Sequence, residues 1–220
     1  MILTPDELRS LLELTHHSPH TLLGMHPLGD QSGLVVRALL PNVKKVAIRP
    51  VHEPAKPKFE LLRIPNTDVF EGVTHEAKAV YAYDLVITDE QNKITYRRDA
   101  YSFLPTLGEA DLFLFGKGDE RKIYDKLGAQ LRVIDGVHGT SFAVWAPNAQ
   151  RVSVVGDFNQ WDGRVYPMRL LGASGVWEIF IPGVGQGAHY KFEIRDAHGR
   201  IKLNTDPFGF FFEIAPKQAA

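Results

Sequence analysis

The sequence predicts an all-β protein of two tandem β-sandwiches, with a short helix at its N-terminus. Two observations lead to this class. Short apolar runs alternate with turn residues along most of the chain, and the first half recurs in the second. The composition agrees, because 44% of the 220 residues are hydrophobic and 23% are charged, as in a folded globular chain.

The first 25 residues predict a helix and a segment that leads into the first sandwich. Thr4 is placed as the N-cap, Pro5 as the first helical residue and Glu7 as the partner in a capping box. We expect the helix to end before Pro19, because proline breaks a helix.

Residues 26–108 predict the first sandwich. Their apolar runs are short and rich in β-branched residues, and turn residues such as Pro and Asn stand between them. This pattern is typical of antiparallel strands in a sandwich or a barrel. The runs are GLVVRALL, KKVAIRPV, FELLRI and VYAYDLVIT.

An internal repeat, at an offset of about 106 to 109 residues, predicts a second sandwich at 131–215. LLPNVKKVAI corresponds to WAPNAQRVSV, with the same Pro-Asn turn and the same alternating strand. Chance similarity between two all-β segments is the alternative. Further matches, in the same order, pair Gly33 with Gly139, Glu71 with Glu178, Tyr81 with Tyr190 and Asp99 with Asp206.

Residues 109–130 are predicted to connect the two sandwiches. They contain an apolar run that resembles a strand (DLFLF), a charged turn (GKGDERK) and a short helical stretch (KIYDKLGAQL). We expect a connector here, because these pieces are too short for a third domain.

Charge and composition exclude several function classes. The formal net charge is −1, so the chain lacks the basic surface that binds a nucleic-acid backbone. No apolar window reaches the length of a membrane span and no signal peptide is evident, so we expect no membrane partner and a cytoplasmic location. With no cysteine, disulfides and cysteine-built zinc sites are ruled out.

No motif predicts a cofactor, a metal or a catalytic residue. His16 and His20 have the spacing of two ligands on one helix face, but Pro19 interrupts that helix. The sequence contains no Gly-rich phosphate loop and no nucleophile elbow. We therefore expect neither a cofactor nor a metal site.

The second half carries a nearly continuous signature, which reads IYDKLGAQL, GVHGTSFAVWAPNAQRVSVVGDFNQWDG, SGVWEIFIPG, YKFEI and DPFGFFFE. It resembles the carbohydrate-binding module of family 48 in bacterial 1,4-α-glucan (glycogen) branching enzymes, an immunoglobulin-like β-sandwich. In the first half, HTLLGMH, VVRALLP and LFLFGKG are similar to the extra amino-terminal sandwich of some members. The resemblance thus implies two immunoglobulin-like sandwiches.

The resemblance also implies a non-catalytic region of a larger glycosyltransferase. Branching enzymes use an aspartate and a glutamate on a (β/α)₈ barrel, which needs about 250 residues by itself. The two sandwiches already fill this chain, so 216–220 would begin the connection to that barrel. The implied partners are α-glucan (glycogen or amylose) and the barrel. A stand-alone glucan-binding or scaffold protein, and the matching region of a debranching enzyme, are the alternatives.

Trp161 is the first candidate for glucan contact. The preceding strand ends at Gly156, so this tryptophan lies among polar turn residues. The C–H face of a sugar ring packs on an indole, and amides such as that of Asn159 bind sugar hydroxyls. Packing against its own sandwich and contact with the barrel are the other interpretations.

Lys191 is the second candidate, because it matches a lysine that glucan-binding relatives direct at sugar hydroxyls. Strand alternation places it opposite Tyr190 and Phe192, where an ordinary solvent-facing lysine is the alternative. Leu203 stands where some relatives have a second tryptophan, which implies a weaker sugar clamp.

The remaining aromatic residues are assigned to packing. Trp145 and Trp177 lie within alternating strands, so both are predicted in the core. Near the C-terminus, Phe208, Phe210 and Phe212 would share one strand face and Phe211 the other. One of those faces would need a partner, plausibly the barrel, unless the run folds over its own domain.

Overall fold

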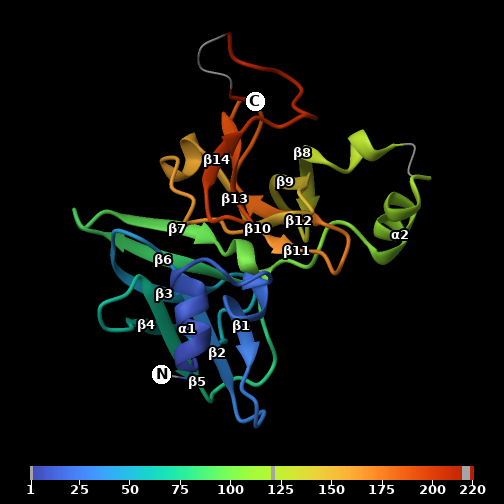
Figure 1. The fold of residues 1–220 in the computed structure, drawn as a ribbon. Helices are drawn as coiled ribbons and strands as arrows, with labels where there is room; N and C mark the ends of the chain where they lie inside the picture. The colour runs from blue at the N-terminus through green and yellow to red at the C-terminus, as the bar shows by residue number, and fades with distance from the viewer. Residues whose placement is uncertain (1, 120–121, 215–218) are drawn as a thin grey trace. The chain divides into compact units, whose positions relative to one another are not determined.

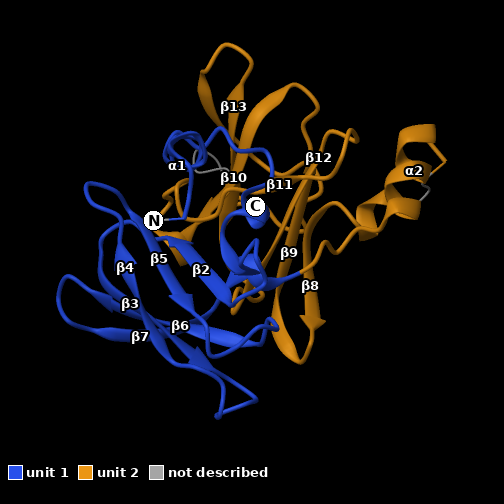
Figure 2. Ribbon diagram, turned by 90° about the horizontal axis from the view of Figure 1, so that it is seen from below, with its two compact units in different colours: residues 1–103 blue, residues 104–220 orange. Residues whose placement is uncertain are grey.

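The computed structural model describes residues 2–119, 122–214 and 219–220, and it divides into two compact units. Unit 1 comprises residues 1–103 and unit 2 residues 104–220 (Figure 2). Both units are built mainly of antiparallel strands, so the predicted all-β class is confirmed. Within the part described, no helix is long and apolar enough to span a membrane.

Unit 1 begins with helix α1 (Pro5–Leu12), whose capping box forms as the sequence predicts. The Thr4 hydroxyl accepts a hydrogen bond from Glu7 N, while Glu7 Oε2 accepts one from Thr4 N at 2.8 Å. A 3-10 turn, η1 (Pro19–Thr21), follows. Leu11 of the helix is buried in one cluster with Leu39 and Val69, so α1 packs onto the strands of its own unit.

Seven strands complete unit 1 in the order β1-β2-β5-β4-β3-β6-β7 (Figure 1). β4 pairs with both β5 and β3, so it joins the two halves of the sandwich. Val36, Ile48 and Phe70 come from different halves but share one buried cluster, which places the core between them. The strands are β1 (Gly24–Pro27), β2 (Leu34–Leu39), β3 (Val43–Pro50), β4 (Phe59–Arg63), β5 (Val69–Thr74), β6 (Tyr83–Asp89) and β7 (Ile94–Arg98).

Unit 2 has the same plan. One sheet has the order β11-β12-β9-β8 and the other β10-β13-β14. The rings of Phe142 and Tyr190, one from each sheet, lie 4.9 Å apart in the core between them. The elements are α2 (Glu109–Lys117), η3 (Ile123–Asp125), β8 (Gly128–Ile134), β9 (Val137–Trp145), β10 (Ala149–Gly156), η4 (Asp157–Asn159), β11 (Arg169–Leu170), β12 (Val176–Pro182), β13 (Tyr190–Asp196) and β14 (Ile201–Asn204).

A buried tyrosine–aspartate pair recurs in the two units. The Tyr83 hydroxyl donates to Asp99, and the Tyr190 hydroxyl donates to Asp206, with the same separation of 16 residues in each unit. In both pairs the carboxylate also accepts the backbone N–H two residues further on. The counterpart of Tyr190 is therefore Tyr83, whereas the sequence alignment had suggested Tyr81.

The duplication includes the helix that precedes each sandwich. Gly24 follows η1 with φ +92°, and Gly128 follows η3 with φ +82°. A Cβ atom on Gly24 would lie 2.9 Å from the carbonyl oxygen of Tyr101, and one on Gly128 would lie 2.9 Å from Cβ of Phe208. In the division into two units, the described residues of the predicted connector 109–130 belong to unit 2, where η3 and Gly128 correspond to η1 and Gly24 of unit 1.

Helix α2 replaces the strand predicted for DLFLF. Gly108 is its N-cap, and Gly108 N donates to Asp111 Oδ2 at 2.9 Å. Leu112 and Phe115, three residues apart, pack on the buried cluster of unit 2. The GAQL part of the predicted helical stretch belongs instead to strand β8.

The aromatic run near the C-terminus forms turns and irregular structure, not the predicted strand. Phe208 packs on the buried cluster of unit 2, whereas Phe210 and Phe211 are strongly exposed. The chain then returns to the sheet at Ala220, which exchanges two backbone hydrogen bonds with Tyr190. Exposed aromatic side chains are thus present near the C-terminus, but they belong to a loop and not to a strand.

Candidate functional site

The candidate site of unit 2 is built on the loop that follows β10, and Asn159 determines its shape. This side chain is buried. Its Oδ1 accepts a hydrogen bond from Gly156 N at 2.8 Å, and its Nδ2 donates to the carbonyl oxygens of Val154 (2.9 Å) and Asp162 (3.2 Å). All three contacts are to backbone, so the amide holds the loop closed on the end of β10.

Trp161 is presented by this loop in a fixed orientation. Gln160 and Trp161 have φ of 56° and 61°, and Trp161 N donates to the carbonyl oxygen of Gly156 at 3.0 Å. The indole Nε1 donates to Asp157 Oδ1 at 3.1 Å, while the other oxygen of that carboxylate lies 3.0 Å from His189 Nδ1. The side chain is nevertheless 39% exposed, which makes its ring accessible to a ligand.

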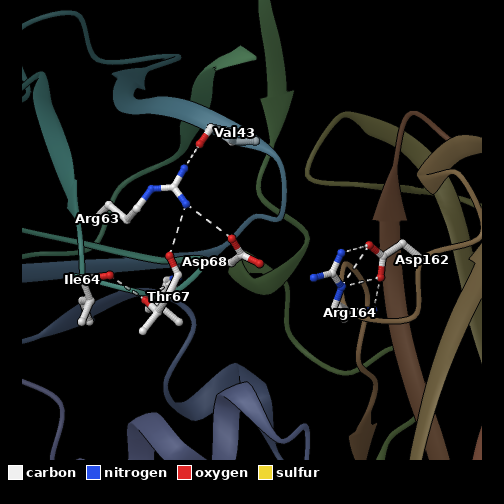
Figure 3. A network of polar contacts seen from close by, with 8 residues as sticks. Val43, Arg63, Ile64, Thr67, Asp68, Asp162 and Arg164 are labelled. Carbon is white, nitrogen blue, oxygen red and sulfur yellow. Dashed lines mark hydrogen bonds and ion pairs between the residues drawn. The ribbon is translucent and has the colours of Figure 1, made fainter. Parts of the chain in front are cut away.

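The rest of the loop is fastened by a charged pair and a close contact. Arg164 donates to both oxygens of Asp162, and these hydrogen bonds hold the pKa of the Asp162 carboxyl below its ordinary value (Figure 3). A Cβ on Gly163 would lie 2.2 Å from Glu193 Oε1, so a larger residue there would require the Glu193 carboxylate to move. The loop therefore lies on the face of the sheet that carries Glu193.

Figure 3 also shows how an arginine fixes a turn in unit 1. Arg63, at the end of β4, donates to the backbone oxygens of Val43 and Thr67 and is 3.4 Å from Asp68. These contacts tie the β4–β5 turn to the start of β3.

Lys191 lies on the same face of the sheet as Glu193, because the two residues are two apart on β13. Tyr190 and Phe192 point into the core, as predicted, and Lys191 is partly buried on the opposite face. Leu203 of β14 is exposed and pairs with Glu193. We call Trp161, Gly163, Lys191, Glu193 and Leu203 the Trp161 face.

Two family models match the chain, one in each unit. Residues 4–101 match the alpha-1,4-glucan branching enzyme GlgB N-terminal domain, and residues 126–209 match carbohydrate-binding module 48 (isoamylase N-terminal domain). The chain is 43% identical over 215 residues to the 1,4-alpha-glucan branching enzyme GlgB of Myxococcus xanthus, and 46% identical over 195 residues to that of Thiobacillus denitrificans. The chain belongs to the GlgB branching-enzyme family, as its amino-terminal, non-catalytic region.

The alignments cover nearly all of this branching-enzyme region but a minor part of its relatives. They include 97% and 88% of the chain, but only 28% and 25% of the Myxococcus and Thiobacillus enzymes. The segment that matches module 48 lies within unit 2 and contains the whole Trp161 face.

The other two tryptophans of this branching-enzyme region have different environments. Trp177 is buried and donates to the carbonyl oxygen of Ala146, so its predicted place in the core is confirmed. Trp145 is 54% exposed, so the prediction of a core position was wrong. It is the last residue of β9, where its ring lies against that of Phe115 of α2 and its Nε1 donates to the carbonyl oxygen of Ser174 at 3.2 Å.

No metal-binding cluster of three or more His, Asp or Glu side chains occurs within residues 2–119, 122–214 and 219–220. His16 and His20, the spaced pair noted in the sequence, lie on either side of the start of η1. The Trp161 face presents an aromatic ring, an ammonium group, a carboxylate and an aliphatic side chain.

Proposed function

We propose that this chain contacts α-glucan through the Trp161 face, as part of a larger 1,4-α-glucan branching enzyme. The observation that carries the proposal is an exposed indole held rigidly by the Asp157 hydrogen bond and by the loop backbone. A ring fixed before binding loses little conformational entropy when a sugar packs on it. The match of 126–209 to a carbohydrate-binding module supports the same ligand class.

In this proposal, Lys191 binds sugar hydroxyls beside the indole. Its ammonium group offers three donors, and Glu193 on the same face offers an acceptor. Glu193 is paired with Arg151, which fixes the position of its carboxylate. Leu203 supplies aliphatic contact where a second aromatic ring would bind more strongly.

Asn159 has an indirect role in this proposal. Its amide is occupied by backbone groups, so it acts by positioning Trp161 and not by touching the glucan. The functional signal in GDFNQW is therefore shared between a residue that binds and a residue that shapes the loop.

We further propose that the complete enzyme is cytoplasmic and carries a catalytic barrel, which these units help to orient toward glycogen or amylose. The supporting observation is the length of the branching-enzyme relatives, of which this chain spans about a quarter. Glucan transfer would then depend on residues outside this sequence.

Affinity electrophoresis in glycogen-containing gels tests the Trp161 face. We expect the chain to be retarded, Trp161→Ala to lose most of the retardation and Trp161→Phe to keep part of it, because a phenyl ring still packs on sugar. Trp145→Ala is the matched control, because Trp145 lies in the same unit and is more exposed than Trp161.

Equal retardation of the Trp161→Ala and Trp145→Ala variants would contradict the assignment of Trp161. A parent chain that migrates alike with and without glycogen would contradict glucan binding itself.

A further inference from the structure

Unit 1 presents an exposed aromatic ring on the face that corresponds to the Trp161 face. Tyr96 lies on β7, the last strand of the unit 1 sheet, and is 58% exposed. Ile94, two residues before it on the same face, is also exposed. We call Arg49, Asp84, Ile94, Tyr96 and Arg98 the Tyr96 face.

The strand registers of the two units establish this correspondence. Tyr96 of β7 pairs with Val86 of β6, and Leu203 of β14 pairs with Glu193 of β13. Both pairs obey the offset of 107 residues that relates Tyr83 to Tyr190. Tyr96 therefore occupies the position of Leu203, on the face of the sheet that points away from the core.

The exposed aromatic residue comes from a different element in each unit. In unit 2 the loop after β10 supplies Trp161, and β14 has no aromatic residue, with Leu203 at the position of Tyr96. In unit 1 the loop after β3, residues 51–58, contains no aromatic residue other than His52, and the ring is supplied by β7 instead. Each unit thus presents one exposed ring on the equivalent face.

Arg49 contacts the Tyr96 ring and belongs to a network of charged side chains on the same face. Arg49 Cζ lies 4.3 Å from the ring centroid, and Arg49 Nη2 is 2.7 Å from Asp84 Oδ2. Arg98 Nε lies 3.4 Å from the other oxygen of the same carboxylate. By register, Asp84 occupies the position of Lys191, so both faces have a charged side chain next to the aromatic position.

This combination favours a neutral sugar. The guanidinium groups donate and the carboxylate accepts, as the hydroxyls of a pyranose require, while the ring offers a surface for its C–H face. Arg49 packs on the Tyr96 ring and restricts its movement. Because Tyr96 is still 58% exposed, the rest of its ring is accessible to a ligand.

We propose that the Tyr96 face is a second α-glucan contact surface, with Tyr96 as its platform and Arg49 and Asp84 as its polar partners. The ligand class rests on the proposed function of the Trp161 face, because the two faces are equivalent positions of a duplicated fold. The chain then has two independent sugar contacts, one in each unit.

Isothermal titration with maltoheptaose, supported by affinity electrophoresis in glycogen gels, tests this. We expect Tyr96→Ala to remove one of two binding sites and to weaken glycogen retention about two- to tenfold. Tyr96→Phe should retain the site, because it keeps the ring. Tyr124→Ala is the matched control, a tyrosine with 56% exposure in another part of the chain.

The double variant Tyr96→Ala/Trp161→Ala separates this proposal from the previous one. Residual binding in Trp161→Ala that disappears in the double variant supports a second surface. Complete loss of binding in Trp161→Ala, with Tyr96→Ala equal to Tyr124→Ala, would overturn the Tyr96 face and leave the Trp161 face intact. A parent chain with no maltoheptaose binding would overturn both.

Discussion

Asn159 illustrates how one buried side chain determines the position of an exposed candidate binding residue, Trp161. The loop places two successive non-glycine residues, Gln160 and Trp161, in the left-handed region, which costs about 1–2 kcal/mol per residue. The hydrogen bonds of the Asn159 amide compensate for this cost, because they satisfy Gly156 N and the carbonyl oxygen of Val154. They also add a second hydrogen bond to the carbonyl oxygen of Asp162, which accepts one from Val165 N as well.

We predict that Asn159→Ala lowers the free energy of unfolding of unit 2 by about 1–3 kcal/mol, because buried backbone groups lose their partner. All three tryptophans lie in unit 2, so urea unfolding followed by tryptophan fluorescence reports on this unit. The control is Asn148→Ala at an exposed turn position, expected within about 0.5 kcal/mol of the parent. Equal stabilities of the two variants would contradict the positioning role.

Asp206 gives a pH-dependent prediction. Burial raises the pKa of its carboxyl above the ordinary value, and the Tyr190 hydrogen bond opposes this only in part. A raised pKa means that the folded state binds more protons than the unfolded state. The carboxyl therefore contributes stability at low pH that is lost as the pH rises through its folded pKa.

Asp206→Asn keeps an acceptor for the Tyr190 hydroxyl but cannot titrate. We predict that the stability advantage of the parent chain over this variant decreases as the pH is raised from about 4 to about 7, measured by urea unfolding at each pH. An advantage that stays constant or grows over this range would contradict the raised pKa.

Among the elements, the strands were the most predictable from sequence. The Pro-Asn turns and alternating residues of LLPNVKKVAI and WAPNAQRVSV predict β3 and β10, and both strands form there. DLFLF was misassigned because a short apolar run has no clear period. Its helix is defined by glycines at both ends, with Gly108 as N-cap and Gly118 in the left-handed region as C-cap.

The sequence is enough to select the candidate site residues by type, but their geometry required the structure. The signature GDFNQWDG indicates a polar turn with a tryptophan, which the loop after β10 confirms. The inward direction of the Asn159 amide depends on backbone groups of Val154 and Gly156 that no sequence pattern displays. The exposure of Trp145 depends equally on where β9 ends.

Substitution of Gly128 tests the junction between η3 and the first strand of unit 2, which corresponds to the junction between η1 and β1 in unit 1. Gly128→Ala should destabilise unit 2 through its positive φ and through overlap with Phe208 and Asp206, whose atoms lie 2.9 and 3.1 Å from the added Cβ. Gly136→Ala is the matched control, because its φ is +75° but no atom lies within 4 Å of the added Cβ.

We expect Gly136→Ala to lower the free energy of unfolding of unit 2 by about 1–2 kcal/mol, because of its positive φ alone. Gly128→Ala should lower it by about 1–3 kcal/mol more, because of the overlap. The measurement is urea unfolding followed by tryptophan fluorescence. Equal losses in the two variants would show that the contact with the Phe208 turn is unimportant.

For the molecule as a whole, the exposed rings near the C-terminus predict self-association. Phe210 and Phe211 are strongly exposed in a segment without regular structure, and exposed apolar patches favour contacts between chains. Sedimentation velocity should show association that increases with concentration and is reduced in Phe211→Ser. A monomer at all concentrations, or equal association of the variant, would contradict an adhesive surface here.

The central claim, that the Trp161 face binds α-glucan, is tested most directly by the indole N–H signals in a ¹⁵N correlation spectrum titrated with maltoheptaose. The chain has three tryptophans, so three such signals serve as internal controls for one another. We predict that the Trp161 signal shifts progressively and saturates, because its Nε1–H belongs to the exposed ring on which the sugar packs and is oriented by the hydrogen bond to Asp157. The signals of buried Trp177 and of Trp145 should remain in place. The claim would be contradicted if maltoheptaose shifted other resonances and left the Trp161 signal in place. It would also be contradicted if maltoheptaose shifted no resonance at all.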